Sequence, residues 1–98
     1  MKKTVRKDRN DGLYRAILGL RTVEECMRFF EDLCTMTELA AMEQRFEVAG
    51  LLRDGLIYSD ILEQTGASSA TISRVNRSLQ YGEGGYEIVF SRMEDGKE

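Results

Sequence analysis

Small, hydroxylated, amide and cationic side chains share one side of a helix predicted over residues 68–80. They are Ser69, Ser73, Arg74, Asn76 and Arg77. Short side chains permit close approach to the DNA major groove, and arginine or asparagine can bind base edges and phosphates. The other side repeats Ile72, Val75 and Leu79 at the spacing of a buried helical stripe. The pattern predicts a helix that can enter the major groove.

The residues before this helix predict that it is the second helix of a helix-turn-helix over residues 58–79. Ile61 and Leu62 give the first helix an apolar side. Gly66 lies where the chain must reverse, and a positive φ has little cost only for glycine. Ser68 is a suitable N-cap, since its hydroxyl can accept a hydrogen bond from the first turn of the second helix.

Length and composition indicate one small domain. The chain has 98 residues, of which 42% are hydrophobic, enough for a core. A chain of this length buries a modest share of its surface, so a second subunit would add considerable stability. No run of residues is long and apolar enough for a membrane span or a signal peptide, and we therefore predict a cytoplasmic protein.

Positive charge is concentrated in two places although the net charge is −3. Residues 1–10 hold an excess of lysine and arginine, and the predicted second helix of the pair carries Arg74 and Arg77 without an acid. The net charge argues against indiscriminate nucleic-acid binding, whereas the asymmetry suits one DNA-facing side. We predict a flexible basic arm over residues 1–10 and a single domain over residues 11–98; the alternative is that the basic start is only a solvated tail.

The sequence offers no catalytic, metal or cofactor site. It contains no histidine for acid–base chemistry. Cys26 and Cys34 lie in one predicted helix about 12 Å apart, too far to form a disulfide within the chain. They are interpreted as reduced core cysteines, and an intersubunit disulfide or a redox sensor is the alternative. We predict that the protein is not an enzyme.

The segment before the helix-turn-helix predicts three helices. Asn10 or Asp11 could cap the first, which would end at Gly19. A capping box with Thr22 and Glu25 predicts the start of the second. The second helix should bury a wide apolar face, wider than one neighbour covers, which favours a partner subunit over a central helix in a monomer. That face consists of Val23, Cys26, Met27, Phe29, Phe30, Leu33 and Cys34.

The third helix is predicted to start after a cap at Thr37, to run over residues 38–53, and to stop at Asp54 and Gly55. Three glycines after Tyr81 interrupt the helical pattern. Residues 86–93 could then form a strand or a short helix, and helix is preferred because no second strand is available for pairing. Five or six helices and no strand make an all-α fold.

The segments EVAGLLRDG and GASSATISRVNRSLQYG resemble the Trp repressor family, and its YerC/YecD branch in particular. The resemblance covers residues 13–93. It implies an all-helical intertwined homodimer whose two recognition helices bind a palindromic operator. It also implies DNA contacts from the start of the recognition helix, at Ser69, Ala70, Thr71 and Ser73. We include Ser68 and Arg74 among the predicted DNA-binding residues as well. From its outward position we add Arg77 as a phosphate contact.

The effector site is where this chain departs from the family pattern. The Trp repressor holds tryptophan between two arginines, with a glycine that makes room and a nearby serine. Arg74 and Ser78 match one arginine and the serine, whereas the other arginine falls at Gln44, with Arg45 one residue away. The glycine falls at Val75, whose side chain would occupy the space of the indole. We therefore expect that tryptophan is not the corepressor, and whether another small molecule binds stays open.

The sequence thus predicts a homodimeric, sequence-specific DNA-binding transcriptional regulator, and more specifically a repressor, whose partner is double-stranded DNA. The alternative is a helical protein–protein interaction module that does not bind DNA. Salt dependence separates the two, because binding through phosphates weakens steeply with salt and an apolar interface does not.

Overall fold

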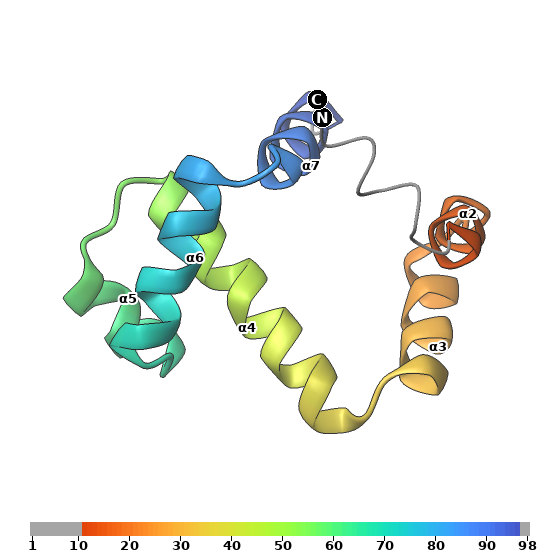
Figure 1. Ribbon diagram of the computed structural model, residues 1–98, viewed down its shortest axis with the longest axis horizontal. Helices are drawn as coiled ribbons and strands as arrows, with labels where there is room; N and C mark the ends of the chain where they lie inside the picture. The colour runs from red at the N-terminus through yellow and green to blue at the C-terminus, as the bar shows by residue number, and fades with distance from the viewer. Residues whose placement is uncertain (1–10, 97–98) are drawn as a thin grey trace. The chain divides into compact units, whose positions relative to one another are not determined.

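The described part of the chain, residues 11–96 of a computed structural model, is all-α, as predicted. It contains six helices and no strand (Figure 1). The helices are α2 (Gly12–Leu18), α3 (Val23–Leu33), α4 (Met36–Arg53), α5 (Tyr58–Thr65), α6 (Ser69–Tyr81) and α7 (Gly85–Asp95). The predicted basic arm, residues 1–10, lies outside the described residues. The chain divides into two compact units, of which the first ends at Leu39 and the second begins at Ala40.

The first unit contains α2 and α3, and the start of α3 confirms the predicted capping box. The hydroxyl of Thr22 accepts a hydrogen bond from the backbone N–H of Glu25 at 3.0 Å. The carboxylate of Glu25 accepts one from the backbone N–H of Arg21 at 2.8 Å. Asp11 stands at the N-cap position of α2 but its side chain does not cap that helix. Its carboxylate accepts a hydrogen bond from Arg15 at 3.1 Å instead, so the predicted capping by the Asp11 side chain is wrong.

The wide apolar face of α3 is not buried within one chain, and its predicted burial against a partner subunit stays a prediction. Neither α2 nor α3 has a buried residue. Val23 is 76% exposed and Met27 is 56% exposed, while Cys26 and Phe30 are half-buried. Two helices of 7 and 11 residues supply too little surface to enclose this face. Both cysteines are free thiols.

The N-terminus of α4 is capped by Thr35, and the predicted cap at Thr37 is wrong. The hydroxyl of Thr35 accepts a hydrogen bond from the N–H of Glu38 at 3.1 Å. The carboxylate of Glu38 accepts one from the N–H of Thr35 at 2.8 Å, completing a capping box. Thr37 is already inside the first turn. The predicted stop is confirmed, because Gly55 has a φ of 93° and takes the left-handed conformation that ends the helix.

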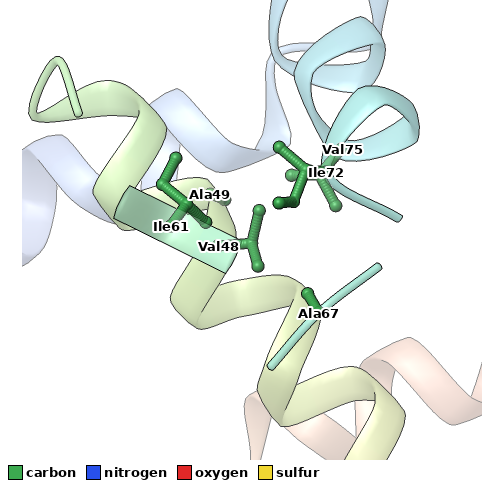
Figure 2. Close-up of a cluster of buried hydrophobic side chains, with 6 residues drawn as sticks. All are labelled: Val48, Ala49, Ile61, Ala67, Ile72 and Val75. Atoms are coloured by element: carbon green, nitrogen blue, oxygen red, sulfur yellow. The ribbon is translucent and has the colours of Figure 1, made fainter. Parts of the chain in front are cut away.

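The core of the second unit joins α4, α5 and α6 (Figure 2). Its buried side chains are Val48, Ala49, Ile61, Ala67, Ile72 and Val75. They come from α4, α5, the turn after α5, and α6, and Figure 2 shows them converging on one centre. Leu79 packs against this cluster, so the predicted stripe along α6 is confirmed.

Residues 85–95 form a helix, α7, so the preference for helix over strand is confirmed. Phe90 of α7 stacks on Phe46 of α4 with ring centroids 5.1 Å apart. Arg53, at the end of α4, donates hydrogen bonds to Glu87 at 3.0 and 3.1 Å and to Glu94 at 2.6 Å. The bonds to both carboxylates raise the pKa of Arg53, and the bonds between Arg53 and Glu87 lower the pKa of Glu87. Stacking and ion pairs therefore hold α7 against the end of α4.

Candidate nucleic-acid interface

The turn between α5 and α6 is fixed by hydrogen bonds from Thr65. Its hydroxyl donates to the carbonyl of Ile61 at 2.7 Å and accepts from the N–H of Ala67 at 3.0 Å. Gly66, between them, has a φ of 73°, and its N–H donates to the carbonyl of Leu62 at 2.9 Å. The predicted turn glycine is therefore confirmed, and the single hydroxyl of Thr65 joins both sides of the turn. Sequence reasoning missed Thr65, although a threonine directly before a turn glycine is a usable signal.

Ser68 caps α6, as predicted. Its hydroxyl oxygen accepts a hydrogen bond from the N–H of Thr71 at 3.1 Å, and the hydroxyls of Ser68 and Thr71 lie 3.1 Å apart. Both hydroxyls therefore have partners within the protein. Ser68 organises the first turn of α6, whose remaining N–H groups and helix dipole favour an approaching anion such as a phosphate.

The outward face of α6 carries the other predicted DNA-contacting side chains. Those of Ser69, Ala70, Ser73, Arg74 and Arg77 are exposed. The helix contains no acidic residue. Within residues 11–96 the ion pairs are made by Arg15 and Arg53, and Arg74 and Arg77 form none. Their two positive charges are thus available to an external partner.

The end of α6 adds polar and aromatic groups that the sequence interpretation did not assign. Tyr81 is 80% exposed, and Gln80 is exposed with its amide donating to Asn76 at 3.3 Å. Their spacing from Arg77, three and four residues, is a signal that places all three on neighbouring parts of the helix surface. The polar surface therefore extends to the last turn of α6.

The residues predicted for an effector pocket have different environments. Val75 is only 2% exposed and belongs to the core, whereas Arg74 and Ser78 are exposed. On α4, Arg45 is half-buried, and the amide of Gln44 donates a hydrogen bond to the carbonyl of Thr65 at 3.2 Å. The valine side chain thus fills space in the core, as the sequence predicted, and Gln44 is engaged with the turn.

The described residues contain no group of three or more cysteine, aspartate and glutamate side chains that could hold a metal ion, and the sequence has no histidine. None of the helices in residues 11–96 is long and apolar enough to cross a membrane. The candidate functional site is therefore the exposed face of the helix pair α5–α6.

Fold and surface together define an all-α protein with a helix-turn-helix. Residues 9–94 match the family described as Trp repressor protein, and the chain belongs to that family. The uncharacterized protein YerC of Bacillus subtilis (strain 168) is 51% identical over 85 residues, which are 87% of this chain and 82% of YerC. The family relationship inferred from the sequence is thus confirmed.

Two solved structures share the fold. A TrpR-like protein from Eubacterium eligens ATCC 27750 is 55% identical, with a TM-score of 0.83 over 86% of this chain and 87% of that one. A putative Trp repressor from Staphylococcus aureus is 45% identical, with a TM-score of 0.86 over 92% of this chain and 93% of that one. Both similarities extend over both units of the chain.

Proposed function

We propose that the protein is a sequence-specific DNA-binding transcriptional regulator that inserts α6 into the major groove of an operator. The observation that carries this proposal is the outward face of α6, which has no acidic residue. Its Arg74 and Arg77 are exposed and form no ion pair with another described residue. Membership of a regulatory DNA-binding family supports it. Exposed arginines bind phosphates and set position, and the first turn of α6 then contacts base edges.

The regulator acts as a homodimer in this proposal. Exposed apolar side chains on α2 and α3, among them Leu18 at 84%, Val23 at 76% and Met27 at 56%, give the first unit a surface that a second copy would cover. A two-fold dimer presents two α6 helices about 34 Å apart, one turn of DNA, so the operator is palindromic. We place the protein in the cytoplasm, where the chromosome lies in bacteria, the sources of its relatives. We further propose that it is a repressor, because a protein that occupies an operator can block transcription.

Tryptophan is not the corepressor in this proposal. Val75 is 2% exposed and packed among Val48, Ile61 and Ile72, so its side chain fills volume that an indole would need. Calorimetric titration of the dimer with L-tryptophan should show no binding at micromolar concentrations. Heat that fits a micromolar dissociation constant would overturn this part of the proposal.

Selection of bound sequences from a random duplex library tests the proposed function. We expect a palindromic consensus with half-sites centred about one helical turn apart. Binding of the selected duplex should weaken steeply between low and physiological salt. Absence of any enriched sequence would contradict the proposal and favour a helical protein–protein interaction module.

A further inference from the structure

A side-chain hydrogen bond connects α4 to the turn of the helix-turn-helix. The side-chain amide of Gln44 donates to the carbonyl of Thr65 at 3.2 Å, across 21 positions of sequence. Both residues are half-buried, so water competes less for this bond than at the surface. The acceptor belongs to the last residue of α5, where the carbonyls of a helix lack partners within the helix. Gln44 thus satisfies a carbonyl that the helix itself leaves open.

Thr65 is the residue through which this contact reaches the turn. Its hydroxyl bonds to Ile61 on one side and Ala67 on the other. Gly66 follows in the left-handed conformation, Ala67 is buried in the core, and Ser68 caps α6. A group that holds the Thr65 carbonyl therefore restrains the segment that sets where α6 begins.

Gln44 also lies on the face of α4 that packs against the helix pair. Val48 is four residues further along α4, hence one turn away on the same face, and it is fully buried with Ile72 and Val75. Two positions one turn apart on α4 thus contact two parts of the helix-turn-helix. Val48 does so by apolar packing, and Gln44 by a directional hydrogen bond. Apolar packing alone is non-directional, whereas a hydrogen bond fixes an orientation.

We propose that Gln44 is a positioning residue, a built-in latch that holds the α5–α6 turn, and with it α6, in the DNA-binding arrangement without a bound ligand. The inference deepens the proposed function and rests on it. Its direct consequence is that the free protein is already pre-organised, so DNA binding does not require a small molecule to order the turn.

Amide hydrogen exchange in the DNA-free protein tests the latch independently of DNA binding. Gln44→Met removes the donor and keeps a flexible side chain of similar size. Gln64→Met is the matched control, because Gln64 is exposed on α5 and makes no side-chain hydrogen bond within the described residues. The reporters are the bonded N–H groups of Gly66, Ala67, Thr71 and Ile72.

We expect these four groups to exchange about fivefold faster in Gln44→Met than in Gln64→Met, the change that corresponds to about 1 kcal/mol for one hydrogen bond. Gln44→Lys supplies an ammonium donor on a long stem and should recover most of the protection. Equal exchange in Gln44→Met and Gln64→Met, or no recovery with lysine, would overturn the latch.

Two further measurements complete the test. In the unmodified protein the side-chain amide protons of Gln44 should exchange more slowly than those of Gln64, and this holds whether or not a variant folds. Equal rates would contradict the hydrogen bond itself.

On a selected duplex, Gln44→Met should bind about fivefold more weakly than Gln64→Met; equal affinities would overturn the positioning role. If the unmodified protein binds no duplex, the proposed function is wrong. The exchange results still show whether Gln44 restrains the α5–α6 turn.

Discussion

The unit that ends at Leu39 and the unit that begins at Ala40 bury their apolar side chains to very different extents. In the second unit Val48, Ile61 and Ile72 are 0% exposed. In the first unit no residue of α2 or α3 is buried, and Val23 is 76% exposed. The second unit closes a core with residues from three helices and a turn, whereas the first leaves an apolar surface open.

Under the proposed function, this difference in burial suits a different role for each unit. A closed core of its own lets the helix-turn-helix keep one geometry in a single chain, which a DNA-reading surface needs. An open apolar surface is what a dimerisation element presents before it meets its partner. We infer that the first unit supplies the dimer contact and the second supplies the DNA contact.

The largest expected effect comes from opening a cavity in the closed core. Ile61→Ala should lower the free energy of unfolding by about 2–5 kcal/mol, because the fully buried side chain is replaced by a methyl group. The loss should be seen in the unfolding of α5 and α6, followed by hydrogen exchange. Leu62→Ala, at an adjacent position that is 45% exposed, is the control and should cost much less. Equal losses would mean that the core is not closed as described.

Charge on the exposed apolar surface of α3 should separate the dimer without unfolding the helix-turn-helix. The double variant Val23→Glu and Met27→Glu should weaken dimerisation by at least about 3 kcal/mol, since burying one such side chain contributes about 1.5–3 kcal/mol. Light scattering across a concentration series measures this, and hydrogen exchange in α5 and α6 should change little. A dimer that persists unchanged would show that this face is not the interface.

Backbone conformation at the turn gives a smaller effect. Gly66→Ala places a Cβ in open space, but the φ of 73° costs a non-glycine residue about 1–2 kcal/mol. Gly50→Ala is the matched control. Gly50 lies inside α4, in its last turn, and its added Cβ would meet Phe90 at an ordinary 3.8 Å, so the substitution should stabilise by about 0.5–1 kcal/mol. Chemical denaturation compares the two, and a stabilising Gly66→Ala would contradict the turn geometry.

The smallest effect concerns the attachment of α7. Arg53 lowers the pKa of Glu87 by hydrogen bonding and by its charge, so the pair stabilises the fold above the unfolded-state pKa of about 4.5. That contribution is lost as the pH falls through the lowered folded-state pKa of Glu87. Glu87→Gln should therefore be slightly less stable than the unmodified protein at pH 7, and the difference should disappear at more acidic pH. A difference that grows on acidification would contradict the assigned pair.

Local chemistry made much of the second unit predictable from the sequence. Residue type and short-range spacing predict the turn glycine Gly66, the N-cap Ser68 and the buried stripe of Ile72, Val75 and Leu79. The Thr35 cap also has a signal in the sequence, since Glu38 follows Thr35 by three residues, whereas the predicted cap was Thr37, directly before Glu38. Here the pattern was sufficient and its interpretation was wrong.

Contacts between distant residues could not be predicted in the same way. The pairing of Arg53 with Glu87 spans 34 positions, and that of Gln44 with Thr65 spans 21. No periodicity relates such partners, because they meet only after the helices pack. The exposure of the α3 face follows for the same reason: its apolar pattern predicts burial without saying whether the covering surface belongs to the same chain.

The salt dependence of DNA binding by arginine variants tests the central claim most directly. Each phosphate contact contributes about 0.9 to the slope of log affinity against log salt, so Arg77→Ala, which removes two contacts per dimer, should reduce the slope by about 1.8. The double variant Arg74→Ala and Arg77→Ala should lose DNA retention and remain dimeric. Arg92→Ala, which removes an exposed charge from α7, should leave slope and retention unchanged. Retention of DNA by the double variant with an unchanged slope would contradict the assignment of α6 as the DNA-binding helix.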